Sequence, residues 1–438
     1  MFYLIIVLFI AGYAAIAFER RLPVDRAAIA LATGGLIWVC IAFGGDTPHR
    51  ELVEHLGGIG ELLFFLLGTM TIVEIIDSHG GFSILSKLVK TANNVKLLWI
   101  FSFLTFFLSA VLGNLSAAIV MIAMIWKFVG GNYSRWLFAG MTVIAANAGG
   151  AWSPMGNITT AMLWIGGRIS TWHIVTQLFV PSLICMLAPL VIISLTMKGD
   201  AVPPSNTGSI KSLAPTTDRE RRMILLSGIG ALMLVPVFRA VTQLPPYIGV
   251  MLALAAMWIM TEILHRNHKE FKIRLTLPEI FKKLNIANIF FLLGILLAVA
   301  GLQSAGHLNL LGGFLSEKVH NIYAINIVIG ALSSVVDNIT LIAGSMNMYD
   351  LVSQDALSMI SDPAKAAYMR HFVSNGSFWE LLAYSVGTGG NILIAGSLSG
   401  IAAMGLAKID FMWYIRKMSL LALAGFLSGF AAYYLIVR

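Results

Sequence analysis

Charged residues are scarce in this chain. Only 11% of its 438 residues are Asp, Glu, Lys or Arg, whereas 58% are hydrophobic and the mean hydropathy is +0.85. A soluble domain carries about 25% charged residues. The composition therefore excludes an ordinary soluble protein. It predicts an all-α polytopic membrane protein, because a helix satisfies its own backbone hydrogen bonds inside lipid.

Cysteine is almost absent as well. Cys40 and Cys185 are the two cysteines, and both lie in apolar stretches, where a thiol usually serves as a small hydrophobic group. This excludes a disulfide framework and a cysteine-rich metal site. No nucleotide motif, metal cluster or nucleophile–base pair stands out, so the sequence indicates neither an enzyme nor a cofactor.

The N-terminus lacks the basic segment with which a signal peptide begins. Residues 1–18 are apolar and precede Glu19-Arg20-Arg21, which predicts a retained first span. The net charge is +8. Because the Lys and Arg residues gather in short loops between apolar stretches, we interpret them as a topology signal and not as a nucleic-acid surface. Their distribution predicts that the N-terminus lies outside.

Twelve apolar stretches divide into two kinds. Eight are long enough to cross a hydrocarbon core of ~30 Å, and we expect full crossings at 1–18, 27–44, 58–77, 174–197, 223–242, 248–264, 288–304 and 419–437. The stretches 97–127 and 321–349 have polar tips and short arms, which predicts re-entrant hairpins. The stretches 137–166 and 379–406 are interrupted at Asn147–Asn157 and at Gly387–Asn391, which predicts discontinuous helices.

The order of these segments repeats. Each half has three spans, a hairpin, a broken helix and a last span. Because a hairpin returns to its own side, each half crosses five times and the second half is inverted. We expect a first inverted repeat with a leading helix over 1–197, a cytoplasmic linker over 198–222 and a second inverted repeat over 223–438.

Small and amide residues mark both hairpin tips and both breaks. Irregular backbone at bilayer depth is tolerated only where it is buried in protein or lines a wet cavity, and such breaks indicate a transporter with its site near the midplane. Neutral oxygens suit a hard cation such as Na⁺. The candidate ion or substrate ligands are Asn114, Ser116, Asn157, Thr159, Thr160, Asn338, Thr340 and Asn391. The alternative is that they only cap helices and bond neighbouring helices.

Asp337 is the sharpest single candidate, because a carboxylate at a hairpin tip must pair, bind a cation or take up a proton. We predict that it binds a proton and a cation in turn, and that Asn114, Asn157 and Asn338 complete a Na⁺ site with it. The alternative is a structural cap on the returning helix. Glu74 and Asp77, one turn apart, either pair with loop lysines or form a proton path. Glu380 is expected to favour the start of the second broken helix.

Five stretches resemble the NhaD family of bacterial Na⁺/H⁺ antiporters, within the ion transporter superfamily. They are residues 64–74 (FFLLGTMTIVE), 147–154 (NAGGAWSP), 294–300 (GILLAVA), 333–338 (SSVVDN) and 387–390 (GTGG). The resemblance covers nearly the whole chain. It implies export of Na⁺ or Li⁺ in exchange for protons, through an inverted-repeat fold that is usually a homodimer with a moving transport domain and a static scaffold.

The chain departs from that family at three acidic positions. Gly113 and Asn157 stand where the family has Asp, and Gln303 stands where it has Glu. Such a site also suits a Na⁺-coupled symporter of a small dicarboxylate or other anion, which is the second hypothesis. A non-transporting homologue is the third. We expect a Na⁺(Li⁺)/H⁺ antiporter that works by alternating access.

Overall fold

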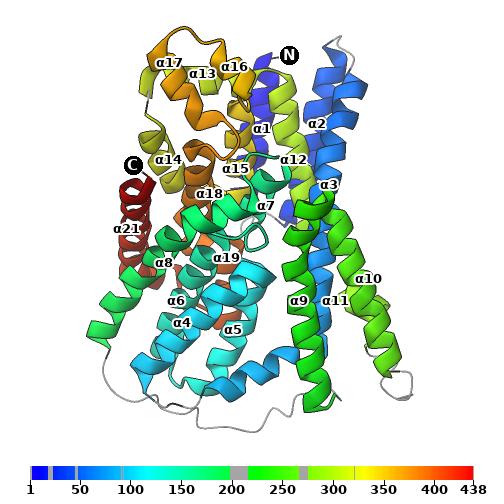
Figure 1. Ribbon diagram of the computed structural model, residues 1–438, viewed down its shortest axis with the longest axis vertical. Coiled ribbons are helices and arrows are strands. Elements are labelled where there is room, and N and C mark those ends of the chain that lie inside the picture. Colours follow the sequence, from blue (N-terminus) through cyan, green and yellow to red (C-terminus); the bar gives the residue numbers. More distant parts are fainter. Residues whose placement is uncertain are drawn as a thin grey trace.

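The structure, a computed structural model, describes residues 2–17, 23–44, 48–89, 91, 93–197, 216–265, 275–319 and 321–437. Within these residues it contains helices, one isolated bridge between Val352 and Val373, and no strand. The helices form one bundle, with the N-terminus at the same end as α13, α16 and α17 (Figure 1).

The first half follows the predicted order of segments. Its helices are α1 (Phe2–Ala17), α2 (Arg26–Phe43), α3 (Pro48–Ser78), η2 (Gly81–Leu88), α4 (Asn94–Leu112), α5 (Asn114–Phe128), α6 (Asn132–Ala151), α7 (Ile158–Ile165) and α8 (Thr171–Thr196).

The second half follows the same order with short helices added between the main ones. Its elements are α9 (Asp218–Thr242), α10 (Pro246–His265), α11 (Leu277–Lys283), α12 (Ile286–Ser304), α13 (His307–Val319), α14 (Ile322–Leu332), α15 (Asn338–Met348), α16 (Gln354–Ser358), α17 (Pro363–Met369), η3 (Arg370–Phe372), α18 (Ser377–Gly389), η4 (Ile394–Gly396), α19 (Leu398–Ala407), α20 (Phe411–Tyr414), η5 (Ile415–Ser419) and α21 (Leu420–Val437).

Eight helices in the described part of the chain are long and apolar enough to cross a membrane, so this is a multi-pass membrane protein. Seven coincide with predicted crossings. The eighth is α4, with 19 residues, so the expectation that each hairpin arm is too short to cross is wrong for this arm. The helix α1 covers Phe2–Ala17 of the predicted span 1–18, whose two end residues lie outside the described residues. The helix α3 begins ten residues before the predicted span, at Pro48.

The linker boundary also moves. Residues 198–215 lie outside the described residues, but α9 already begins at Asp218. A capping box explains this start, because the Thr217 hydroxyl accepts from the Glu220 backbone N–H while the Glu220 carboxylate accepts from the Thr217 backbone N–H. Residues 218–222 are therefore the first turn of a helix and not part of a linker.

Both broken helices are present, with shifted boundaries. The first runs as α6 to Ala151 and resumes as α7 at Ile158. The second runs as α18 to Gly389 and resumes as α19 at Leu398, with the short turn η4 between them. The predicted interruptions began too early, because Asn147 is inside α6 and Gly387 is inside α18.

Two pairs of helices, each with one helix from either half, pack antiparallel. Along α3 and α12 the contacts are antiparallel, since His55 hydrogen-bonds Ser304 while Lys283, just before α12, bonds Ser78. Along α8 and α21 they are also antiparallel: a Cβ on Gly425 would meet the Cys185 carbonyl, and one on Gly429 would meet the Pro181 carbonyl. These pairs are the third and the last spans of the two halves.

The two breaks share one packing pattern. A Cβ on Gly149 would lie 2.1 Å from the Phe106 carbonyl oxygen, and a Cβ on Gly389 would lie 2.1 Å from the Gly330 carbonyl oxygen. Only glycine permits so close a backbone approach of hairpin to broken helix. The halves also exchange partners: α5 packs on α19, α15 packs on α7, and α6 packs on α18. Gly149 and Gly389 therefore align the two halves residue by residue.

Candidate functional site

The first hairpin turns at a residue that only glycine suits. Gly113 has φ +85° and ψ 149°, a region almost restricted to glycine. The next residue, Asn114, donates its backbone N–H to the Gly156 carbonyl at 2.9 Å, which ties the tip to the first break. A cavity of about 60 Å³ lies here, lined among others by Gly113, Asn114, Ser116 and Asn157.

A buried amide network joins this tip to the second break. The Asn147 side chain accepts from Asn114 Nδ2 and Ser399 Oγ, each at 2.8 Å. It donates to Asn391 Oδ1 at 2.7 Å and to Ser397 Oγ at 2.9 Å. Two donated and two accepted bonds use the full capacity of an Asn amide. We call Asn147, Asn391, Ser397 and Ser399 the bonded cluster.

The corresponding place across the repeat looks different. Gly149 and Gly389 align Asn147 with Gly387, Asn157 with Ser397 and Thr159 with Ser399. A Cβ on Gly387 would lie 3.3 Å from Asn157 Nδ2 and 3.8 Å from Thr159 Oγ1. We call Gly387, Asn157 and Thr159 the unpaired cluster.

Position 387, which aligns with Asn147, is a glycine, so it offers no side-chain amide to Asn157 and Thr159. Asn157 Nδ2 and Thr159 Oγ1 have no hydrogen-bond partner among the described residues, although Asn157 is only 5% exposed and Thr159 is fully buried. Unpartnered buried polar groups are costly and call for an explanation such as an ion or water. Thr160, next in α7, bonds the Gly150 carbonyl at 3.5 Å.

The second tip carries a half-buried carboxylate. Asp337 caps α15, because its side chain accepts from the backbone N–H groups of Ile339 at 3.1 Å and Thr340 at 3.5 Å. Its own N–H donates to the Tyr13 hydroxyl at 2.6 Å. The capping alternative is thus realised, yet one carboxylate oxygen, Oδ1, is left outside these bonds.

The remaining predicted ligands of the second half lie beside this tip. Asn338 Oδ1 accepts from Ser333 Oγ at 2.7 Å, and that hydroxyl also lies 2.8 Å from the Val386 carbonyl. A Cβ on Gly390 would lie 2.9 Å from Asn338 Oδ1, so the second tip touches the second break. The Thr340 hydroxyl has no partner among the described residues.

The four predicted Na⁺ ligands consequently fall into two groups. Asn114 and Asn157 line the cavity at the first tip, whereas Asp337 and Asn338 lie at the second tip. The path that joins them runs through Asn147 and Asn391. The hydrogen-bonding roles of Asn147, Ser397 and Ser399 were missed from the sequence, because their partners lie far away in the chain. Aligning the Gly-Gly pairs of the two halves would have found them.

Glu74 and Asp77 lie apart from this network, at the end of α3. Glu74 accepts from Ser78 at 2.9 Å, and the Lys283 ammonium lies 3.9 Å from its carboxylate. The side chain of Glu74 is about one-quarter exposed. Glu74 thus has the lysine partner that the sequence offered as one alternative. A proton path through Glu74 and Asp77 stays a prediction.

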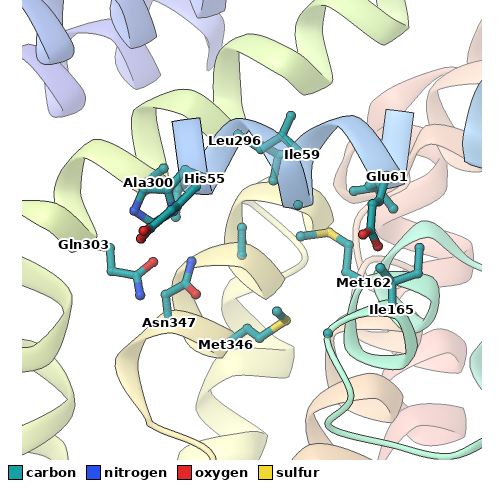
Figure 2. A pocket seen from close by; sticks show the side chains of 16 residues that line it. His55, Ile59, Glu61, Met162, Ile165, Leu296, Ala300, Gln303, Met346 and Asn347 are labelled. Carbon is teal, nitrogen blue, oxygen red and sulfur yellow. The ribbon is translucent and has the colours of Figure 1, made fainter. Parts of the chain in front are cut away.

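A larger pocket of about 280 Å³ lies where α3 and α12 face α7 and α15. In Figure 2, His55, Gln303 and Asn347 gather at one end, and Glu61 lies at the other beside Met162 and Ile165. Because α7 and α15 start at the first break and the second tip, the pocket lies along the two half-helices that lead away from the site.

Comparison with known proteins places the chain among transporters. The citrate transporter family (CitMHS) matches residues 13–369. The chain is 39% identical to "Sodium/proton antiporter 1" of Arabidopsis thaliana over 97% of its length and 71% of the relative, and 37% identical to "Sodium/proton antiporter 2" over 97% of both. It is 29% identical to "Na(+)/H(+) antiporter NhaD" of Vibrio cholerae, over 94% of this chain and 87% of that one.

The chain therefore belongs to the citrate transporter family of membrane proteins. Within it the chain is of NhaD type, which confirms the resemblance predicted from the motifs. Identity is higher to the two plant relatives than to the Vibrio protein.

Proposed function

We propose that this protein is a secondary Na⁺(Li⁺)/H⁺ antiporter that works by alternating access. Four relatives, two from Arabidopsis thaliana and two from Vibrio species, are named as sodium/proton or Na(+)/H(+) antiporters. The observation that carries the proposal within this chain is the unpaired cluster, where a buried hydroxyl and a buried amide converge on a glycine without bonding each other.

The cation binds between the first tip and the unpaired cluster. A hard monovalent ion prefers several oxygen ligands, and Thr159, Asn157 and Asn114 supply them next to the 60 Å³ cavity. The Asn157 amide makes no hydrogen bond that would fix which of its ends faces the cavity, so it is free to present its oxygen. Ser116 and the carbonyls of the break add further ligands, and Thr160 supports the turn.

Asp337 carries the proton. Its carboxylate caps α15 by accepting from two backbone N–H groups, and these bonds favour its charged form when the site is wet. Closure of the site removes water and favours the protonated form. The carboxyl group thereby alternates between a proton and electrostatic support for the cation, with Asn338, Thr340 and Asn391 around it.

The architecture proposed for this cycle is an inverted repeat with two re-entrant hairpins. The opposite directions of α3 and α12, and of α8 and α21, support the inversion. The pocket of about 280 Å³ that Glu61 lines is then the outer access route. It lies between the long helices α3 and α12 and the half-helices α7 and α15. We place the N-terminus outside a bacterial inner membrane and expect a homodimer.

Symport of an anion is the second candidate. Membership of the citrate transporter family and the absence of carboxylates at Gly113 and Asn157 favour it. The size of the site favours antiport, because about 60 Å³ accommodates a small ion with a few waters and leaves little room for a dicarboxylate.

The test compares the two candidates in proteoliposomes that contain the purified protein. Na⁺-triggered proton movement without Na⁺-dependent uptake of succinate is the result expected. Asp337→Asn should abolish the proton movement, because an amide cannot carry a proton at this site, while Na⁺ binding persists. Undiminished proton movement in this variant, or succinate uptake that requires Na⁺, would overturn the proposal.

A further inference from the structure

A second ionisable cluster lies away from both breaks. Glu380 sits in the first turn of α18 and is 2% exposed. Its Oε1 contacts His173 Nε2 near the start of α8, and its Oε2 accepts from the Tyr433 hydroxyl in α21. Three helices from both halves thus converge on one carboxyl group. None of these residues takes part in the ion site described above.

The burial of this carboxyl group makes its charge costly. An ionised carboxylate without water needs a hydrogen-bonded partner of opposite charge, or else it takes up a proton. His173 and Glu380 share one proton in the neutral pair, whichever of them holds it. Without that proton the cluster carries a negative charge on a group that water hardly reaches, and only the Tyr433 hydroxyl stabilises it.

His173 gives the cluster a route to the surface. Its side chain is 34% exposed, compared with 2% for Glu380. The imidazole therefore receives a proton from the aqueous phase on one face and contacts the buried carboxylate on the other. An imidazole has two ring nitrogens, so one is able to face water while the other contacts the carboxylate.

The position in α6 that corresponds to Glu380 in α18 has no such cluster. Gly140 stands as far before Gly149 as Glu380 stands before Gly389, so these two residues correspond. A Cβ on Gly140 would lie 3.0 Å from Met418 Cε, so a methionine fills this position of the first half. The first half therefore has no carboxyl group at the position that corresponds to Glu380.

We propose that His173, Glu380 and Tyr433 form a proton-binding site, separate from the ion site, that sets the pH range of transport. The site acts on α18, which carries Glu380 in its first turn and ends at the second break. Uptake of one proton from the adjacent aqueous phase completes the hydrogen-bonded His173–Glu380 pair, which holds α18 to α8, and weakens the bond from Tyr433 of α21 as the carboxylate loses its charge. The effect on transport rests on the proposed antiport, whereas proton binding itself does not.

Other ionisable groups near α18 are fewer and differently bonded. Tyr323 of α14 faces Tyr433, Arg168 lies over the Trp379 ring at 5.3 Å, and His371 of η3 bonds Ser377 Oγ at 2.6 Å. Burial lowers the pKa of His371. It lies at the same end of the molecule and makes no contact with Glu380, so it provides a matched control.

The decisive measurement is infrared titration of the purified full-length protein in lipid. The Asp337→Asn background removes the other carboxyl group that is proposed to carry a proton. In this background the protein should show a carbonyl band of a protonated carboxyl group that disappears as the pH rises. Adding Glu380→Gln should remove this band, and adding His371→Gln should retain it. A band that is unchanged when Glu380→Gln is added would overturn the proton site, whatever the transport assays show.

The transport arm uses the same variants. The pH of half-maximal Na⁺-dependent proton movement should move by about one unit or more in Glu380→Gln and stay in place in His371→Gln. If Glu380→Gln does not fold, Tyr433→Phe tests the same idea, because loss of its donated bond favours the protonated carboxyl group and moves the midpoint to higher pH. An unmoved midpoint in the folded variants would overturn the effect on transport.

Discussion

Both helix breaks are lined by small polar residues, but their hydrogen bonds differ. In the bonded cluster Asn147 makes four hydrogen bonds and satisfies both serines that start α19. In the unpaired cluster Gly387 occupies the matching position, and the residues that start α7 keep unsatisfied polar atoms. The presence of one side-chain amide, at position 147 and not at position 387, therefore distinguishes a hydrogen-bonded structural contact from a candidate binding site, although both breaks share one packing pattern.

The largest effect should come from making the two breaks alike. Gly387→Asn places an amide against Asn157 and Thr159, as Asn147 does on the other side. Loss of two ligand contacts at about 1–1.5 kcal/mol each raises the apparent KM for Na⁺ by roughly 10–100-fold. Na⁺-triggered proton movement in proteoliposomes measures this. Gly387→Ala adds only a Cβ, with its nearest neighbour at 3.3 Å, and serves as the control; equal KM values for both variants would refute the comparison.

Removal of the amide from the bonded cluster should affect stability first. Asn147→Ala leaves Asn114, Asn391, Ser397 and Ser399 short of partners. We expect a loss of roughly 2–4 kcal/mol, because buried polar groups lose their bonds. Thermal unfolding of the purified protein measures it. Asn326→Ala is the comparison, since that buried amide donates only to a carbonyl of its own helix and should cost less.

A charge introduced at the unpaired cluster should sharpen the contrast. Asn157→Asp supplies a carboxylate oxygen and should lower the KM for Na⁺ by about tenfold, or ~1.4 kcal/mol. Gly113→Asp should instead lower the melting temperature, because φ +85° costs a residue with a Cβ on the order of 1–3 kcal/mol. A better KM in Gly113→Asp than in Asn157→Asp would contradict this assignment.

The smallest effect is expected in the outer pocket. Glu61→Gln removes a negative charge that raises the local cation concentration, so the KM for Na⁺ should rise about two- to threefold, and less at high ionic strength. Glu51→Gln is the matched control, because Glu51 is an exposed carboxylate of the same helix that does not line the pocket. Equal changes in both variants would remove the pocket from the access route.

The sequence predicted much of this arrangement. Apolar stretches long enough to span lipid located the helices, and the Gly-Gly pairs with nearby Asn located the breaks, because both signals are local. The start of α9 at Asp218 is also predictable from the sequence, because Thr217 and Glu220 have capping-box spacing. The predicted linker, 198–222, wrongly included this start. Asn147 and Glu380 could not be assigned from the sequence, because their roles depend on partners such as Asn391 and His173 that lie far away in the chain.

The exchange of partners between the halves has a mechanical consequence. Asn147 of α6 is fastened to the chain that follows α18, and the tip before α5 is fastened to Asn147. Movement of one broken helix therefore pulls on the other, so in the proposed transport cycle the two tips and the two breaks move as one unit. The route to either side of the membrane then opens along the outer faces of this unit, where α7 and α15 meet α3 and α12, and not through its centre.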